Sequence, residues 1–220
     1  MSGSASLFSE PRREVAPGAV HLPQWLDGSA QRRIVAAFTQ WSRAPVPMRA
    51  PLVRGGNAMS VQIVCLGWHW RPYRYTRVAD DVNGAPVAPL PDWLADLGRR
   101  AVTAAYGEGA GDRYEPDAAL LNYYDEHARM GMHQDRDETA DEPVVSFSVG
   151  DSCRFRFGNV ETRARPYTDV TLASGDAFVF GGPSRLAYHG VVKVLPGTAD
   201  PTCGLVHARI NVTLRVTGLR

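Results

Sequence analysis

A histidine and an aspartate separated by one residue, His133 and Asp135, are well placed to bind a metal ion together. Their segment is typical of a strand, in which residues i and i+2 point to the same side. His189, in a later predicted strand, could supply a third ligand. Two histidines and one carboxylate on one face of an ion leave its other positions open, as in non-haem Fe(II) oxygenases. Alone, each pattern is weak, because exposed polar pairs and structural histidines are common.

The last predicted strand, residues 207–216, alternates between apolar and polar side chains. The apolar face must pack on a core. The polar face consists of His207, Arg209, Asn211, Thr213 and Arg215. If both faces are enclosed, the two arginines point inward and need an anionic ligand to offset the cost of their burial. Two guanidinium groups suit a dicarboxylate, because each binds a carboxylate through two hydrogen bonds. The alternative is a solvated polar face on an outer strand.

A third polar pattern, Asn122 and Tyr124, lies eleven residues before His133. The two residues alternate onto one side of a predicted strand. An amide and a phenol there could complete a pocket for a carboxylate. The alternative is an ordinary strand with a tyrosine at its edge.

Two helices are expected in the first half of the chain, at about residues 29–43 and 92–106. Apolar residues recur at helical spacing in both segments. Asp27 can cap the first helix. Pro91 precedes the second helix, and Gly107 ends it.

After residue 115 the apolar period changes to two, with turn residues between short segments. Strands are expected at residues 59–66, 119–124, 130–134, 143–149, 153–157, 170–172, 177–180, 188–194 and 207–216. Early helices followed by many strands predict an α+β fold, an antiparallel sandwich or barrel buttressed by helices. Such a fold can hold a site between its sheets.

Composition limits the other possibilities. The 220 residues suffice for one domain, expected at 19–220 after a flexible segment at 1–18. The odd number of cysteines (Cys65, Cys153 and Cys203) and the lack of a CxxC pair argue against a disulfide framework or a zinc site. A reducing cytoplasm fits this composition. No apolar run is long enough to span a membrane, and residues 1–16 contain no secretory signal pattern.

The net charge is only +1, so the total charge predicts no strong attraction to nucleic acid. Residues 1–55 nevertheless contain seven arginines against three acidic residues, and Lys193 is the single lysine of the sequence. Arginine suits contacts with phosphate. The alternative explanation of the arginine excess is a compositional bias of the genome.

Four segments resemble motifs of the AlkB family of Fe(II)/2-oxoglutarate dioxygenases, which repair alkylated nucleobases. They are LNYY at 121–124, HQDRDE at 133–138, SRLAYHG at 184–190 and RINVTLR at 209–215. The resemblance extends from about Trp25 to the C-terminus and is densest between residues 120 and 215. It implies a double-stranded β-helix (jelly-roll) core at about residues 115–218 and a nucleotide-recognition lid at about 57–90.

The resemblance also implies roles for single residues. The iron ligands would be His133, Asp135 and His189. The distal carboxylate of 2-oxoglutarate would be held by Tyr124 and Arg209, and its iron-chelating end by Asn122, Asn211 and Arg215.

The substrate residues follow from the same resemblance. Those implied are Trp68, stacking on the flipped base opposite His133; Tyr73, at the nucleic-acid backbone; Asp137, near the base; and Arg163 or alternatively Arg165, in the substrate pocket. The lid is a few residues shorter than in the best-known bacterial members of the family, and it contains a second candidate for stacking, Trp70.

The implied activity is oxidative dealkylation of bases such as 1-methyladenine and 3-methylcytosine in DNA, with RNA left open as a substrate. The reaction would use Fe(II), O₂ and 2-oxoglutarate and release succinate, CO₂ and an aldehyde. The expected partner of a cytoplasmic monomer is alkylated DNA, single-stranded or with a flipped base, and not a membrane. Two alternatives are a 2-oxoglutarate oxygenase acting on RNA, protein or a small molecule, and a metal-binding module without turnover, holding zinc. The double-arginine strand disfavours the binding module, which needs no cosubstrate pocket.

Overall fold

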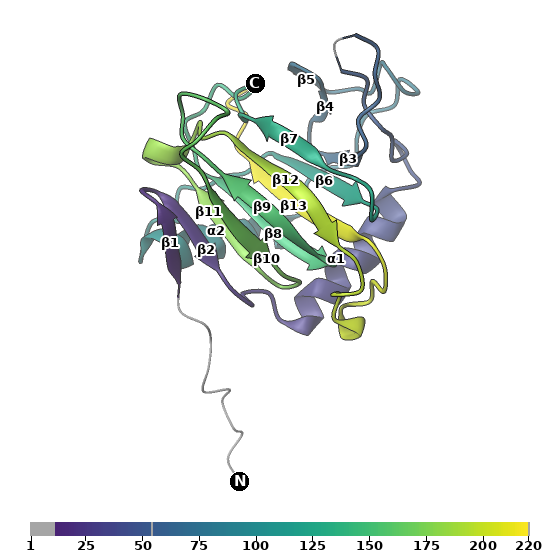
Figure 1. Cartoon of the computed structure of the whole chain (residues 1–220). Coiled ribbons are helices and arrows are strands. Elements are labelled where there is room, and N and C mark those ends of the chain that lie inside the picture. Colours follow the sequence, from purple (N-terminus) through teal and green to yellow (C-terminus); the bar gives the residue numbers. More distant parts are fainter. Residues whose placement is uncertain (1–11, 54, 220) are drawn as a thin grey trace.

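Two antiparallel sheets form the core of the computed structural model, which describes residues 12–53 and 55–219 (Figure 1). The larger sheet has the order β1 (Arg13–Ala16), β2 (Ala19–Leu22), β11 (Ala177–Phe180), β8 (Val144–Gly150), β13 (Arg209–Arg215), β6 (Ala118–Tyr124) and β3 (Gln62–Leu66). The smaller sheet has the order β10 (Thr168–Leu172), β9 (Ser152–Phe157), β12 (His189–Leu195) and β7 (Met130–His133). The expected antiparallel core with helices beside it is therefore confirmed.

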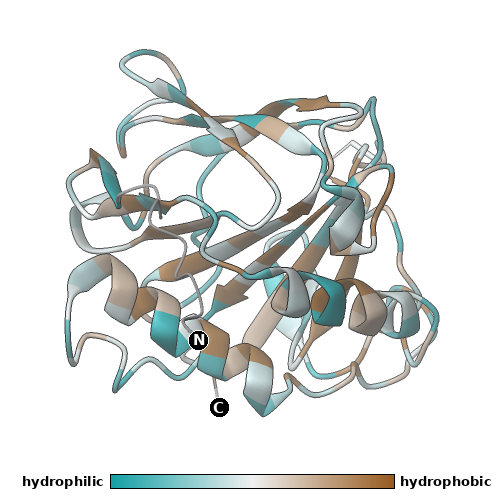
Figure 2. Cartoon of the chain, turned by 90° about the horizontal axis from the view of Figure 1, so that it is seen from below, coloured by the Kyte–Doolittle hydropathy of each residue, from teal (hydrophilic) through white to brown (hydrophobic). Residues whose placement is uncertain are grey.

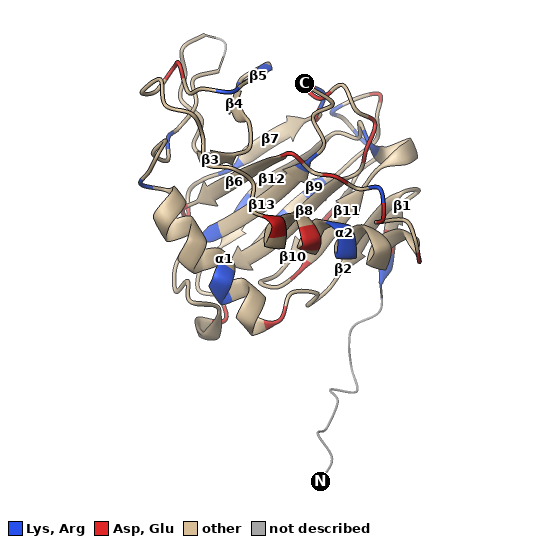
Figure 3. Cartoon of the chain, turned by 180° about the vertical axis from the view of Figure 1, so that it is seen from behind, with Lys and Arg blue, Asp and Glu red and all other residues tan. Residues whose placement is uncertain are grey.

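The helices α1 (Gly28–Trp41) and α2 (Asp92–Tyr106) cover the outer face of the larger sheet, and both lie in front of it when the molecule is seen from behind (Figure 3). Asp27 caps α1 by accepting a hydrogen bond from the backbone N–H of Ala30. Gly107 ends α2 in a backbone conformation with φ 106°, which favours glycine. Both helices match the predicted segments to within two residues.

Strict alternation along the strands divides the apolar residues into two layers. In β13, Ile210 belongs to the layer under the helices, whereas Arg209 points to the space between the sheets. In β11, Val179 lies under the helices and Phe178 lies between the sheets. Figure 2 shows hydrophobic residues concentrated along the strands behind the helices. The larger sheet is thus enclosed on both faces, which excludes the solvated outer strand considered for residues 207–216.

A two-stranded ribbon, β4 (His69–Arg71) and β5 (Arg74–Thr76), stands apart from both sheets near β3 and β7 (Figure 1). Two 3₁₀ turns, η1 (Gly182–Ser184) and η2 (Pro201–Cys203), precede β12 and β13. The sequence pattern did not predict the ribbon, because three residues are too few to establish a period of two.

Two other expectations need correction. The flexible segment expected at residues 1–18 includes residues 13–16, which instead form β1 and pair with β2; residues 1–11 lie outside the described part of the chain. The strand expected at 59–66 begins only at Gln62. All three cysteines are buried and free. Among the described residues, no helix is both long and apolar enough to cross a membrane.

Candidate active site

A cavity of about 600 Å³ opens between the two sheets and extends under the β4–β5 ribbon. Its walls bring together the three polar patterns singled out in the sequence. The members of those patterns that line it are Asn122, Tyr124, His133, Asp135, His189, Arg209, Asn211, Thr213 and Arg215. Residues far apart in the chain therefore converge because β6 and β13 pair in the larger sheet while β7 and β12 pair in the smaller one.

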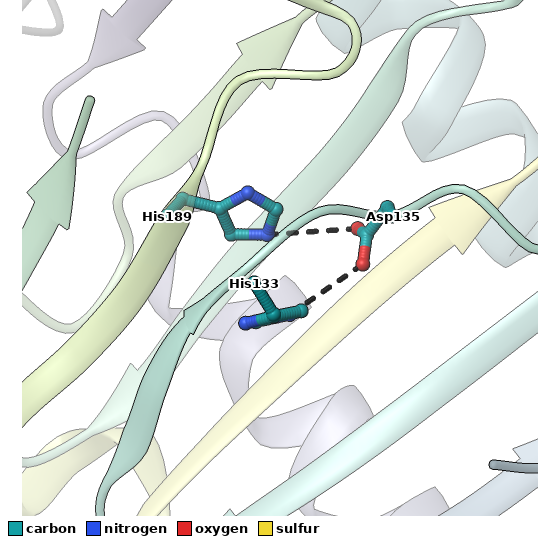
Figure 4. A group of neighbouring side chains, drawn as sticks. All are labelled: His133, Asp135 and His189. Carbon is teal, nitrogen blue, oxygen red and sulfur yellow. Dashed lines mark ion pairs between the residues drawn. The ribbon is translucent and has the colours of Figure 1, made fainter. Parts of the chain in front are cut away.

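The predicted metal ligands converge at one point of the cavity (Figure 4). His133 and His189 are directly opposite each other in the β7–β12 pair, and Asp135 follows just beyond β7. The Nε2 atoms of the two histidines lie 3.5 Å and 3.6 Å from the carboxylate oxygens of Asp135. One ligand atom from each residue lies within 4.8 Å of the others. This spacing fits a single ion bound by all three.

The ring orientation of both histidines is fixed by the backbone. Nδ1 of His133 lies 2.9 Å from the carbonyl oxygen of Gly131, and Nδ1 of His189 lies 2.9 Å from that of Ala187. A neutral ring that donates from Nδ1 turns the lone pair of Nε2 to the common point. Oδ2 of Asp135 also accepts no hydrogen bond. Three acceptor atoms facing one another require a cation, so the residues fit a divalent metal such as Fe(II).

Charge and burial prepare these groups for metal binding. Burial, together with the neighbouring His133, lowers the pKa of His189 to about 4, which keeps its ring neutral. Burial raises the pKa of Asp135, but Arg215, His189 and His133 together outweigh burial, and the pKa lies well below its usual range. Near neutral pH the site therefore presents a carboxylate and a neutral imidazole, the forms that bind metal.

The close approach of β7 and β12 leads to a first prediction. A Cβ added at Gly190 would lie 2.5 Å from the carbonyl oxygen of Met130 and would force the two strands apart. We expect Gly190→Ala to weaken iron binding at least about tenfold, because overpacking of this kind costs about 1–3 kcal/mol and here displaces two ligands. Iron titration monitored by calorimetry measures the effect. Gly131→Ala is the control, since its Cβ would meet nothing within 4 Å; equal affinity in both variants would contradict the prediction.

Arg209 lies at the inner end of the cavity and is only 1% exposed. Its guanidinium donates to Ser148 Oγ at 2.7 Å and, at 3.3 Å, to the carbonyl oxygen of Asp151. Its Nε has no hydrogen-bond partner, and within the described residues no carboxylate forms a salt bridge with it. A buried cation without a counterion is costly, so an anionic ligand is expected beside it.

The other predicted carboxylate ligands surround this position, but they are not equally available. The Asn211 side-chain amide already donates to Ser146 Oγ at 2.6 Å. Asn122 Oδ1, which has no partner among the described residues, is an acceptor and cannot itself bind a carboxylate. The hydroxyl of Tyr124 lies 3.9 Å from the sulfur of Met130. Arg209 is thus the strongest attachment point for an anion.

Arg215 differs from Arg209, because two acidic residues already neutralise it. Its guanidinium lies 2.8 Å from Asp135 Oδ1 and 2.9 Å from Glu138 Oε1. Arg185 completes the cluster, donating to Glu138 at 3.1 Å and to the backbone carbonyl of Asp135 at 2.6 Å. Arg215 therefore contacts a metal ligand directly. Sequence reasoning assigned no role to Glu138 and Arg185, although both lie inside the motifs that carried the resemblance.

The expectation for Trp68 requires correction. Trp68 is 5% exposed, donates from Nε1 to Asp117 at 2.9 Å, and stacks under the guanidinium of Arg77. It does not line the cavity, whereas Trp70 does. The indole N–H of Trp70 donates to Asp137 Oδ2 at 2.9 Å. Trp70 is thus the lid tryptophan that lines the cavity containing the predicted metal ligands.

The remaining predicted substrate residues lie around the mouth of the cavity. Tyr73 is 56% exposed at the turn of the β4–β5 ribbon, and Asp137 lies beside Trp70. Arg163 lines the mouth, with its guanidinium 5.7 Å from the ring centre of Tyr188. Arg165 does not line the cavity and lies over Tyr167 instead, so of the two alternatives the geometry favours Arg163.

Comparison with known proteins agrees with this geometry. A family model described as the 2OG-Fe(II) oxygenase superfamily matches residues 18–215. The alpha-ketoglutarate-dependent dioxygenase AlkB homolog of Caulobacter vibrioides is 39% identical over 207 residues, covering 91% of this chain and 88% of that protein. The alpha-ketoglutarate-dependent dioxygenase AlkB of Escherichia coli is 36% identical over 217 residues, covering 96% and 95%.

Plant relatives match as well. The DNA N(6)-methyladenine demethylase ALKBH1D of Arabidopsis thaliana is 31% identical over 226 residues, and the chain spans about half of its length (51%). The solved structure of OsALKBH1 superimposes with a TM-score of 0.82 at 31% identity, covering 93% of this chain and all of that one.

Proposed function

Since the chain belongs to the AlkB family of 2OG-Fe(II) oxygenases, we propose that it removes alkyl groups oxidatively from nucleobases, using Fe(II), O₂ and 2-oxoglutarate. Bases alkylated on a ring nitrogen in DNA, such as 1-methyladenine and 3-methylcytosine, are the proposed substrates. Relatives are named as dioxygenases of this type and, in plants, as DNA demethylases.

The observation that carries the proposal is the buried, uncompensated Arg209 in the same cavity as the metal triad. A dicarboxylate bound there through one end directs its other end along the cavity toward His133, Asp135 and His189. A metal-binding module without turnover gives no reason to keep a buried guanidinium that, among the described residues, forms no salt bridge in the same cavity as the triad. The pair of features therefore favours a cosubstrate-dependent enzyme.

The protein's contribution to the reaction is binding, orientation and exclusion of water. Arg209 holds the cosubstrate, and the two histidines with Asp135 hold the ion on the side of the cavity that faces the lid. When bound, Fe(II) would supply oxidation of the alkyl C–H bond, coupled to conversion of 2-oxoglutarate to succinate and CO₂. The oxidised alkyl group then leaves the base nitrogen as an aldehyde.

The substrate base is proposed to enter flipped out of the strand, between the lid and the metal site. Alkylation of the pairing edge breaks base pairing and so lowers the cost of flipping. Stacking on Trp70 offsets part of that cost, by about 1–3 kcal/mol. The Asp137 carboxylate would attract a base made cationic by N-methylation. Tyr73 and Arg163, at the mouth, are proposed to contact the strand that carries the base.

A cytoplasmic location and a monomeric state are part of the proposal. Three buried, unpaired cysteines fit a reducing compartment. Single-stranded DNA is the preferred form of substrate in this account, because there the base need not be unpaired before it enters the cavity.

A panel of modified oligonucleotides tests the substrate class. Protein loaded with Fe(II) under anaerobic conditions is mixed with O₂, 2-oxoglutarate and DNA or RNA carrying 1-methyladenine, 3-methylcytosine or N6-methyladenine. We expect mass spectrometry to show loss of the methyl group from the first two lesions in single-stranded DNA, at rates exceeding those on N6-methyladenine. Turnover restricted to RNA would reassign the substrate, and absence of turnover on every member by folded, loaded protein would contradict the proposal.

A further inference from the structure

The β4–β5 ribbon is too short to be stable without support from the rest of the protein. Each strand has three residues, and an isolated two-stranded ribbon is marginal in water. Yet this ribbon carries Trp70, which lines the cavity containing the predicted metal ligands. Something outside the ribbon must therefore set its position relative to the metal ligands.

Trp70 and Tyr75 are directly opposite each other in the ribbon, and their side chains reach two adjacent residues of one loop. The Trp70 indole donates to Asp137, and the Tyr75 hydroxyl donates to Glu138 Oε1 at 2.5 Å. Residues directly opposite in an antiparallel pair project to the same side. The ribbon is thus attached through one face to the loop that begins at Asp135.

Glu138 is a rigid attachment point. Its side chain is fully buried, and its carboxylate also accepts from Arg215 at 2.9 Å and from Arg185 at 3.1 Å. Both arginines contact Asp135 as well, one at the carboxylate and the other at the backbone carbonyl. The hydroxyl of Tyr75 also lies 3.1 Å from Nη1 of Arg215. Tyr75 is therefore linked to the metal ligand Asp135 directly through Arg215, and also through Glu138 and Arg215.

We propose that Tyr75 and Glu138 are positioning residues that seat the lid ribbon on the metal-ligand loop and thereby place Trp70 over the iron site. This inference rests on the proposed function and adds a specific determinant of nucleic-acid capture. Tyr75 does not line the cavity in which the base and the cosubstrate are proposed to bind. It acts through Trp70, so its removal weakens binding of the nucleic acid while the metal and the cosubstrate remain bound.

Tyr75→Phe is the direct test, because it removes one oxygen atom and keeps the ring in the core. Glu138 keeps both of its arginine partners, so no buried charge is left unpaired and the fold is retained. We expect KM for a 3-methylcytosine oligonucleotide to rise about tenfold. This fold-change corresponds to the lower end of what a hydrogen bond to a charged acceptor contributes. Turnover at saturating oligonucleotide should stay within about twofold of wild type, as for a loss confined to uniform binding.

The matched control is Tyr106→Phe, which removes a hydroxyl that donates to the carbonyl oxygen of Gly18 at 2.9 Å on the helix side of the larger sheet. It should leave KM unchanged. A second measurement needs no nucleic acid: amide hydrogen exchange in residues 69–76 of metal-loaded protein should become about tenfold faster in Tyr75→Phe and not in Tyr106→Phe.

The outcomes separate the two proposals. If wild-type protein dealkylates nothing, the proposed function fails, and hydrogen exchange still decides whether Tyr75 seats the ribbon. If wild type is active but Tyr75→Phe has the KM and exchange rates of the control, Tyr75 does not position the β4–β5 ribbon, and the inference is wrong. Equal weakening of iron, 2-oxoglutarate and oligonucleotide binding would also overturn it, because Tyr75 would then support the whole Asp135–Arg215 cluster and not the lid.

Discussion

Arg209→Ala is expected to raise the 2-oxoglutarate concentration required for half-maximal turnover at least about a hundredfold. Arg209 is 1% exposed and forms no salt bridge with any residue that the structure describes, so a carboxylate bound to its guanidinium forms a buried charge pair. Loss of one partner of such a pair costs about 3–5 kcal/mol. Alanine also leaves space where the guanidinium lay, and neither Asn122 nor Tyr124 carries a charge to replace it. Steady-state kinetics with 2-oxoglutarate and oligonucleotide varied separately measure the effect.

The specificity of this effect matters more than its size. KM for the oligonucleotide should change by no more than about threefold, since Arg209 lies at the inner end of the cavity, away from the lid. Arg209→Lys should recover part of the affinity, because it restores the charge without the paired hydrogen bonds. Arg156→Ala, which removes a half-buried arginine outside the cavity that pairs with Asp169, is the control. Equal increases in both KM values would contradict the assignment of Arg209 to the cosubstrate.

His133→Ala is expected to abolish turnover and to lower iron affinity by more than about a hundredfold. Removal of a residue that only hydrogen-bonds to a metal ligand costs less than this. The side chain of His133 is 34% exposed, so its removal leaves no sealed cavity in the core. The midpoint temperature of thermal unfolding should therefore stay within a few degrees of the wild-type value. Iron titration under anaerobic conditions and formaldehyde release measure the two effects.

A surface histidine supplies the comparison. His127, whose side chain is 87% exposed, lies in the turn between β6 and β7, and His127→Ala should behave as wild type. A folded His133→Ala protein that retained iron and activity would show that the triad is assigned incorrectly. Loss of folding would show instead that His133 supports the β7–β12 pair.

Much of the site was predictable because its signals are local. Period-two alternation in β13 placed Arg209 and Arg215 on one face, and i, i+2 spacing placed His133 and Asp135 together. Enclosure of that strand could not be read from its own residues, since it depends on two helices and a second sheet packing on either side. The resemblance to a known family supplied the step that alternation could not.

The lid was predicted less well, for a physical reason. Trp68 and Trp70 are two residues apart and would share a face in a regular strand. Gly67, where φ is +74°, and Trp68 form the bend before β4 begins at His69, so only Trp70 lies in the strand; Trp68 turns to Asp117 and Trp70 to the cavity. The attachment of the ribbon to Glu138 depends on a hydrogen bond from Tyr75, which lies 63 residues away in the sequence. Such a distant pair leaves no local signal in the sequence.

We propose that one cavity couples oxidation of 2-oxoglutarate at a His133–Asp135–His189 iron site to removal of an alkyl group from a nucleobase. The most direct measurement follows succinate, formaldehyde and the repaired oligonucleotide together, with Fe(II)-loaded protein and single-stranded DNA carrying 3-methylcytosine. We predict formaldehyde and repaired base in equal amounts, matched by succinate and absent without iron or in His133→Ala. Consumption of 2-oxoglutarate by the folded, loaded enzyme with no loss of the methyl group would contradict the account.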